Sequence, residues 1–297
     1  MQVVDASGRI INVSDQENAD LFWALRGGGN GSFGVVTQFN FRTSMVNLVA
    51  KFTITWKRPV AQAARIVLAW QEWLDNLPPA ITCTLHLTRE PGGLIQVHIA
   101  GLSVGSQTSL ISELKRLQKL AGPPDAQSTS TLTFARAATI FNGGGPPYES
   151  VLMKAKSDYI TEPMSEQGVL ALLNGLQNAP GEIAVLFDSY GGAISKIASS
   201  ATAFVHRGGT KYLIQYYMQW ESASANEPNL AMMRTLYASM RPYVSGACYV
   251  NYCDLDLGEG YAKAYWGDNL PRLMKIKAAF DPKNVFRHAQ SVPVELA

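Results

Sequence analysis

The sequence contains few of the residue types that usually mark a redox, metal or disulfide site. Among its 297 residues it has only three cysteines and four histidines, and 16% of its residues are charged. The cysteines form neither an even framework nor a CxxC pair, which argues against a disulfide scaffold. The histidines show no H-x-x-x-H spacing and no carboxylates cluster near them, so we expect no metal site. These residues are Cys83, Cys248, Cys253, His86, His98, His206 and His288.

Charge and hydropathy exclude further classes. The net charge is +2 without a basic cluster, so we expect no nucleic-acid partner and no anionic membrane surface. No apolar run approaches the roughly 20 residues that cross a bilayer, so we expect no membrane partner. A serine hydrolase would show a G-x-S-x-G elbow, which is absent from the sequence. The first residues show no signal peptide and begin with a strand-like pattern, and they predict no compartment.

What is abundant is glycine in one short segment, where five of the eight residues 27–34 are glycine. Residues 29–34 match the dinucleotide fingerprint G-x-G-x-x-G, which requires a strand before the glycines and a helix after them. Here the order is reversed. Residues 14–17 form a capping-box pattern before a short helix over 19–25, and the alternation over 35–41 predicts a strand. We therefore reject a Rossmann site and leave open a plain loop or a backbone wall against a ligand.

The remaining pattern predicts an α+β fold, in which helices pack on an antiparallel sheet. A hairpin opens the chain with strands at 2–4 and 9–13. Alternating and apolar runs then predict the further strands, and apolar residues at helical spacing predict the helices. The strands are expected at 48–56, 81–88, 94–100, 128–132, 153–157, 182–187 and 212–220. The helices are expected at 61–77, 106–120, 165–176, 228–240 and 269–280.

The C-terminal fifth carries an unusual group of aromatic and amide residues. Residues 249–252 read Tyr-Val-Asn-Tyr, and if this run is extended, Tyr249 and Asn251 share one face while Tyr252 lies on the other. The alternative interpretation is ordinary aromatic packing on a strand. By itself this motif does not decide between the two.

Several segments taken together resemble the berberine-bridge-enzyme-like family of FAD-linked oxidases. The matching segments are residues 20–37, the 249–252 motif followed by Asp-Leu-Asp-Leu at 254–257, Tyr-Trp-Gly at 265–267 with Asn269, and 280–287 with Gln290 and Ser291. Weaker similarity lies at 187–192 and 206–209. Because these matches keep the same order over nearly all of the chain, the resemblance is specific. It is to the C-terminal part of such an enzyme, so we expect the main FAD-binding domain of the family to be missing.

The resemblance implies where the cofactor FAD and the reaction would lie. The glycine-rich backbone would line FAD, with Gly28, Gly29, Phe33, Gly34 and Val36 as contacts. Tyr249 and Asn251 would lie at the flavin, and Tyr252 would be the catalytic base. The implied domains are 1–44 as part of the FAD-binding domain, 45–243 as the substrate-binding domain, and 244–297 returning to the FAD domain.

The family carries a second polar catalytic residue on the strand that matches 212–220. At that position this sequence has Leu213, which departs from the family pattern, and Gln215 lies two residues further on the same face. Gln215 and Tyr216 are therefore the candidate catalytic partners of Tyr252. Tyr190, Tyr212, Tyr216 and Trp220 suggest an aromatic-lined pocket for a small-molecule substrate, such as a secondary metabolite or a sugar-like compound.

Three functions remain open. The first is a flavin-dependent oxidase that is incomplete as given, with a separate FAD-domain chain or a homo-oligomer as partner. In the second, a flavin-free protein cyclises or binds a small molecule in the same pocket. The third is a non-catalytic partner protein whose exposed sheet face favours association.

Overall fold

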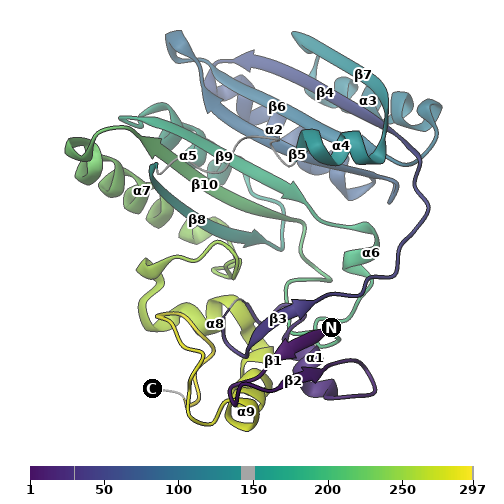
Figure 1. Cartoon of the computed structure of the whole chain (residues 1–297). Helices are drawn as coiled ribbons and strands as arrows, with labels where there is room; N and C mark the ends of the chain where they lie inside the picture. Colours follow the sequence, from purple (N-terminus) through teal and green to yellow (C-terminus); the bar gives the residue numbers. More distant parts are fainter. Residues whose placement is uncertain (30, 142–150, 296–297) are drawn as a thin grey trace. The chain divides into compact units, whose positions relative to one another are not determined.

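The computed structural model describes residues 1–29, 31–141 and 151–295, and divides the chain into two compact units (Figure 1). We call Met1–Ser44, Ile194–Gly208 and Gly246–Ala297 the terminal unit, and Met45–Ala193 with Gly209–Ser245 the central unit. The sequence analysis assigned residues 194–208 to the substrate-binding domain. In the structure they belong with the terminal unit, where Trp23 Nε1 donates to the Ser200 carbonyl at 2.8 Å.

The central unit is built on a seven-stranded sheet of order β7-β4-β6-β5-β9-β10-β8, in which all neighbours are antiparallel. These segments form strands because they are rich in β-branched and aromatic residues, and successive side chains point to opposite faces of the sheet. The strands are β4 (Leu48–Arg58), β5 (Ile81–Arg89), β6 (Ile95–Ser103), β7 (Ala126–Thr133), β8 (Leu152–Ile160), β9 (Glu182–Ser189) and β10 (Tyr212–Trp220).

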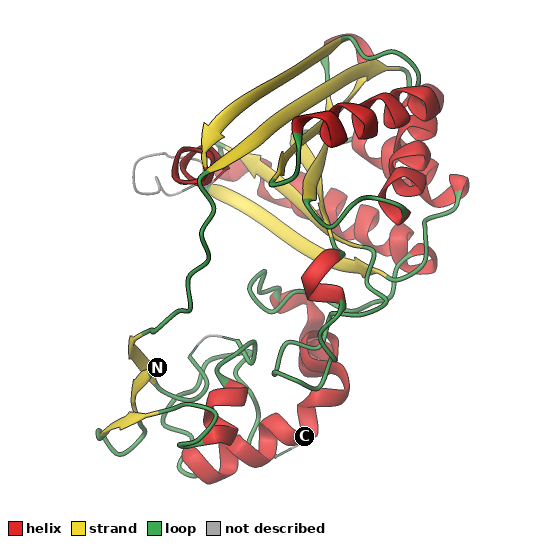
Figure 2. Ribbon diagram, turned by 90° about the vertical axis from the view of Figure 1, so that its right-hand side faces the viewer, coloured by secondary structure: helices red, strands yellow, loops and turns green. Residues whose placement is uncertain are grey.

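Long helices cover one face of this sheet (Figure 2). They are α2 (Val60–Asp75), α3 (Gln107–Ala121), α5 (Glu166–Gln177) and α7 (Asn226–Met240). Ser106 and Ser165 cap α3 and α5, since each hydroxyl accepts a hydrogen bond from a backbone N–H three residues later. Their apolar sides and the facing strand residues form one large core, in which Trp70 packs edge-on against Tyr212 with ring centroids 5.2 Å apart. The antiparallel sheet backed by helices confirms the predicted fold class.

The opposite face of the sheet is polar, and we call it the polar face. It carries the side chains that alternate with the core residues, among them His86, His98, Asp188, Gln215 and Tyr217. These residues come from neighbouring strands in register, so they form continuous rows across the sheet.

The terminal unit contains a three-stranded sheet of order β2-β1-β3. Its elements are β1 (Gln2–Val4), β2 (Ile10–Asn12), α1 (Ala19–Ala24), β3 (Val35–Gln38), α8 (Tyr261–Trp266) and α9 (Leu270–Phe280), and the four-residue α6 (Gly192–Ser195) ends within its middle segment. Trp23, Phe33, Trp266 and Leu273 belong to its own buried core. The two cores are separate sets of residues.

Three details differ from the sequence expectations. The hydroxyl of Ser14 accepts from the N–H groups of Gln16 and Glu17, but it caps a turn, because the helix begins only at Ala19. Strand β3 ends at Gln38 rather than at residue 41, since its partner β1 pairs no further than Gln2. Helix α4 (Phe134–Phe141), which packs on β4 and β7, was not predicted, and neither were the shorter helices α6 and α8. None of the helices in the described residues is long and apolar enough to span a bilayer.

Candidate functional site

The glycine-rich segment of the terminal unit packs tightly against its own protein. Gly27 has a φ of 118°, and an added Cβ would lie 2.4 Å from the backbone nitrogen of Phe204. A Cβ at Gly28 would lie 2.5 Å from the Ala24 carbonyl, and one at Gly34 would lie 2.6 Å from the Val4 carbonyl. Three of the glycines are therefore required by the close approach of protein to protein. Asn30 lies outside the described residues.

Two other glycines of the segment line a cavity of about 290 Å³ within the same unit. At Gly29, with φ of 85°, a Cβ would lie 2.7 Å from Cγ2 of Val250, so only glycine fits there. The cavity is further lined by Gly31, Ser32, Val250, Cys253, Tyr265, Trp266, His288 and Gln290. Of the predicted cofactor contacts, only Gly29 is in this lining. The other residues that line the cavity were not predicted as cofactor contacts, although several of them lie in motifs noted in the sequence.

Two further predicted cofactor contacts, Phe33 and Val36, lie outside this cavity lining. The Phe33 side chain is buried in the core of the terminal unit, so only its backbone is left to meet a ligand. Val36 lies on β3, half-buried against the same core.

A buried lysine fixes the glycine-rich segment. The ammonium of Lys277 donates to the Ser32 carbonyl at 2.7 Å, to Asp281 Oδ2 at 2.6 Å and to the Phe286 carbonyl at 2.6 Å. The side chains of Lys277 and Asp281 are both fully buried. Burial alone would raise the pKa of Asp281, but hydrogen bonds from Lys277 and from two backbone N–H groups outweigh it and lower that pKa. Ser32 Oγ also accepts from the Val292 N–H at 3.1 Å.

The Tyr-Val-Asn-Tyr motif is a turn, and the predicted extended conformation is wrong. The N–H of Tyr252 donates to the Tyr249 carbonyl at 2.9 Å, which closes the four residues on themselves. The rings of Tyr249 and Tyr252 therefore lie together, edge-on at 5.1 Å between centroids, and not on opposite faces. Asn251 is exposed, and its Nδ2 donates to the Tyr249 hydroxyl at 2.8 Å.

A hydrogen-bonded triangle holds the residues that follow this turn. The Tyr265 hydroxyl donates to Gln290 Oε1 at 3.0 Å and accepts from the Asp254 N–H at 2.9 Å. Gln290 Nε2 donates to the Asp254 carbonyl at 2.8 Å. Burial raises the pKa of Tyr265 to about 12, so this phenol stays protonated and serves as a strut.

The cavity in the terminal unit is suited to part of a flavin. Its wall contains glycine backbone, which permits close approach, and the flat ring of Trp266. The Trp266 Nε1 is buried and has no hydrogen-bond partner among the described residues, so a ligand acceptor would satisfy it. The residues present therefore fit the cofactor along one side. No cluster of three or more metal-ligating side chains occurs in the described part of the chain.

In the central unit, the polar face brings together Gln215 and groups that the sequence did not link to it. Gln215 lies opposite Leu186 on β9 and Ser157 on β8, and Leu186 lies opposite His86 on β5. His86 and His98 are cross-strand neighbours with rings 6.3 Å apart, and His98 Nδ1 lies 2.8 Å from Thr55 Oγ1. Burial lowers the pKa of both histidines, so they are neutral near pH 7.

Asp188 is the residue that sequence reasoning missed most clearly. It lies directly opposite Leu213, the position at which the chain departs from the family pattern. Burial raises the pKa of its carboxyl, which has no hydrogen-bond or ion-pair partner among the described residues. The cross-strand register alone brings this group next to Gln215, and no spacing in the sequence reports it.

The structure does not support the predicted catalytic role of Tyr216 or the predicted aromatic pocket. Tyr216 and Tyr212 are on the helix-covered face and are fully buried there, since side chains alternate along β10. Burial raises the pKa of Tyr216 well above its ordinary value, which disfavours a phenolate. Trp220 also packs against that core. Of the four aromatic residues, Tyr190 alone has its hydroxyl beside the polar face, 3.3 Å from that of Tyr159.

Known proteins match this chain in sequence. The family described as "Berberine and berberine like" matches residues 248–293. An uncharacterized FAD-linked oxidoreductase of Bacillus subtilis, YvdP, is 35% identical over 99% of this chain and 65% of its own length. The monolignol oxidoreductase AtBBE-like 13 of Arabidopsis thaliana is 33% identical over 99% of this chain and 60% of its own length.

Solved structures agree. Berberine bridge enzyme from Eschscholzia californica superimposes with a TM-score of 0.90 at 25% identity, over 100% of this chain and 65% of that one. BBE-like 1 of Physcomitrella patens gives a TM-score of 0.90 at 28% identity, over 99% of this chain and 64% of that one. The chain thus spans about 60 to 65% of the length of these relatives. In sequence over nearly its whole length and in fold, the chain is similar to the FAD-linked oxidoreductases of the berberine-bridge-enzyme-like family, which supports FAD as the cofactor.

Proposed function

We propose that this chain contributes to an FAD-linked oxidoreductase that oxidises a small organic substrate, with Tyr252 as the proton acceptor. One observation carries the proposal. Tyr252 lies between Val250, within the same turn, and Cys253, the residue after the turn, and both of these line the same cavity as Gly29 and Gly31. A tyrosine next to a cavity that fits a flavin is the arrangement that removal of a proton and a hydride from one substrate requires.

Bound FAD would supply the hydride acceptor, and the chain's own residues would supply binding and proton transfer. Tyr252 is half-buried, and its ring lies against that of Tyr249. A phenol has an ordinary pKa of about 10, so it needs a neighbour that favours the phenolate. Asn251 holds the Tyr249 hydroxyl and thereby fixes the partner ring against which Tyr252 packs.

We assign substrate binding to the polar face of the central unit. Gln215 offers an amide donor and acceptor, and Asp188 offers a carboxylate that accepts from substrate hydroxyl or amine groups. Asp188 would supply from β9 the polar function that the family places at the position of Leu213. The names of two relatives suggest compounds to try, since one is a monolignol oxidoreductase and another, from Berberis wilsoniae, a tetrahydroberberine oxidase.

A partner protein is a second proposal, supported by exposed apolar side chains on the terminal unit. Ile10, Val35, Phe39 and Phe41 are large apolar residues that are 65%, 56%, 52% and 79% exposed, and the rings of Phe39 and Phe41 stack at 5.7 Å. Apolar surface of this kind favours association. A further flavin-binding chain or a second copy would be the partner.

The test is the visible spectrum of the purified chain with excess FAD, after free flavin is removed. A retained flavin band that substrate bleaches supports the proposal. Tyr252→Phe should then abolish bleaching while flavin stays bound, and Tyr243→Phe in the central unit should leave it unchanged. If the Tyr252→Phe variant is folded, holds flavin and is bleached by substrate as much as the unchanged chain, the assignment of Tyr252 as proton acceptor is refuted.

A further inference from the structure

The two outer strands of the seven-stranded sheet are built differently. Strand β8 lies at one edge of the sheet and β7 at the other. β8 carries Lys156 and Asp158 as buried charged residues, and Arg241 pairs with the Asp158 carboxylate. Inward-pointing charges on an edge strand disfavour pairing with another chain, because the pairing would remove them further from water. The β8 edge is therefore protected against a further strand.

Strand β7 has none of these protections. Its sequence, Ala-Gln-Ser-Thr-Ser-Thr-Leu-Thr at 126–133, contains no charged residue and no proline. It pairs with β4 in unbroken register, from Ala126 opposite Thr55 to Thr133 opposite Leu48. Seven of its eight residues are exposed, and no strand in the described part of the chain lies on its outer side (Figure 1). Its outward N–H and C=O groups are therefore available to an extended backbone.

The charges that flank β7 select a second copy of the chain as its partner. Asp125 is the last charged residue before the strand, and Arg136 is the first after it. The Asp125 carboxylate pairs with Arg58 and is still 44% exposed, while the exposed Arg136 has no ion-pair partner among the described residues. In an antiparallel pair of identical strands, the start of one lies beside the end of the other. Both ends then bring Asp125 of one copy towards Arg136 of the other, whereas a parallel pair would bring like charges together.

Symmetry restricts the register of such a pair. The two-fold axis that relates two antiparallel copies stands perpendicular to the sheet, so each side chain faces one on the same side of the joined sheet. Because successive side chains alternate between the faces, the axis must pass between two copies of one residue. Thr129 or Ser130, in the middle of β7, gives the fullest overlap. Near either axis serine faces serine and threonine faces threonine, and hydroxyl hydrogen bonds stabilise such cross-strand pairs.

Apolar side chains beside the edge add to the contact. Helix α4 follows β7 without a break, and its Phe134 and Phe141 are 46% and 40% exposed, while Leu48 at the start of β4 is 62% exposed. Aromatic side chains contribute much of the area that protein interfaces bury. A contact of this extent is at the low end of the roughly 1,200–2,000 Å² of standard interfaces, so the association is weak and reversible.

We propose that β7 is an interface between two copies of this chain, which pair antiparallel through this strand and join their seven-stranded sheets into one. The surface belongs to the central unit alone and is separate from the exposed apolar residues of the terminal unit. Flavin, substrate and the assigned proton acceptor take no part in it, so the inference is independent of the proposed function.

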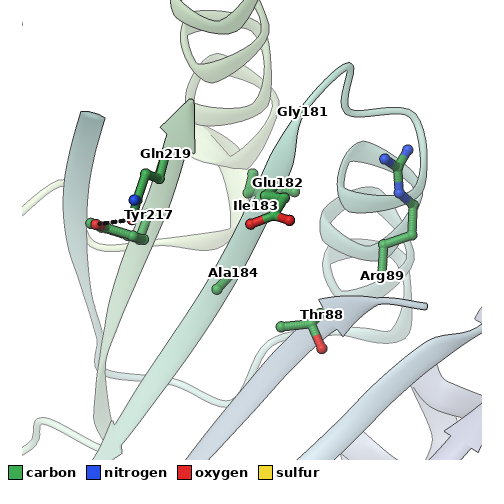
Figure 3. Close-up of a pocket in the computed structure, with 8 residues that line it drawn as sticks. All are labelled: Thr88, Arg89, Gly181, Glu182, Ile183, Ala184, Tyr217 and Gln219. Atoms are coloured by element: carbon green, nitrogen blue, oxygen red, sulfur yellow. Dashed lines mark hydrogen bonds between the residues drawn. The ribbon is translucent and has the colours of Figure 1, made fainter. Parts of the chain in front are cut away.

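Analytical ultracentrifugation of the full chain, from about 5 to 500 μM, measures the self-association. We expect a dimer with a dissociation constant of about 10–100 μM, in the range of weak contacts. Ser130→Lys and Thr129→Lys, which place like charges at or next to the axis, should each weaken it at least ten-fold, and Arg136→Glu about three-fold. The matched control is Gln219→Lys. Figure 3 shows Gln219 on β10, beside a hollow of about 250 Å³, and because β10 is paired on both sides this charge should change nothing.

Cross-linking reports the pairing directly. In a Cys253→Ser background, which removes the exposed cysteine, Thr129→Cys and Ser130→Cys should each form a covalent dimer with a short bismaleimide, because cross-strand Cβ atoms near the axis lie about 5–8 Å apart. Circular dichroism shows whether each variant is folded. A chain that stays monomeric at about 500 μM, a dimer that survives both lysine substitutions, or a failure of both cysteine variants to cross-link would each overturn the proposal.

Discussion

Replacing Lys277 with methionine tests how the glycine-rich segment is held. Methionine has nearly the length of lysine and fills the same buried space without a charge. The change removes three hydrogen bonds at once, those to Asp281, to the Ser32 carbonyl and to the Phe286 carbonyl. It leaves the Asp281 carboxylate fully buried with only the backbone N–H groups of Val285 and Phe286 as donors.

The expected cost follows from what remains unpaired. Breaking a buried ion pair by removing one partner costs about 3–5 kcal/mol, because the other charge stays buried. Two carbonyls that lose their donor add to this, while backbone N–H groups at Asp281 offset part of it. We therefore expect the terminal unit to lose about 3–5 kcal/mol of unfolding free energy, a large share of the stability of a single domain.

Guanidinium denaturation followed by the fluorescence of Trp23 and Trp266, both in the terminal-unit core, gives the measurement. Lys275→Met on the exposed side of the same helix is the matched control and should stay within about 0.5 kcal/mol. A second variant, Lys277→Met with Asp281→Leu, should recover part of the loss, since no charge is then left buried. If Lys277→Met alone costs less than 1 kcal/mol, the pair is not the anchor that its geometry indicates.

Three further predictions concern other sites. Gly29→Ala should cost about 1–2 kcal/mol, because alanine disfavours φ of 85° and its Cβ meets Val250 at 2.7 Å, whereas Gly8→Ala, with φ of 81° and open space, should cost less in the same melt. Ser32→Ala should cost about 1 kcal/mol by the loss of the bond from the Val292 N–H, and an unchanged melting curve would contradict this. Burial raises the pKa of Asp158 to about 6 against the pull of Arg241, so the folded state binds its proton more tightly than the unfolded state. Stability from this group is present below about pH 4 and is lost as the pH rises through 6, by about 3 kcal/mol, and urea titrations should show this fall vanish in Asp158→Asn.

The elements of the central unit could be predicted because their patterns are long and regular. Strand β10 is a nine-residue run of mostly aromatic and aliphatic residues, and helices α3 and α5 carry serine caps and apolar stripes. The pairing of the strands could not be predicted, since register depends on partners far apart in sequence. Helix α4 was missed because its eight residues are too few for a periodic signal beside the preceding strand.

The same limits apply to the site. Counting along one strand placed Gln215 on the same face as Leu213, and the same count places Tyr216 on the other face. What counting could not show is which face the helices cover, and so Tyr216 was proposed as catalytic although it is buried. The turn at Tyr249–Tyr252 contains no glycine or proline, so its residues gave no sign that the backbone bends. Asp188 emerged only when β9 and β10 were seen in register.

The division of the terminal unit into three chain segments has a consequence for the order of events during synthesis. The segment Met1–Ser44 leaves the ribosome before the central unit, but Gly246–Ala297, which completes the core of the terminal unit, comes about 200 residues later. At roughly 5–20 residues per second, the glycine-rich segment would wait about 12–50 seconds for Lys277, while the central unit already has its whole sequence. The glycine-rich wall of the cavity would then become ordered only after the central unit has been synthesised, and a ligand could occupy the cavity only once its lining residues up to Gln290 have been added.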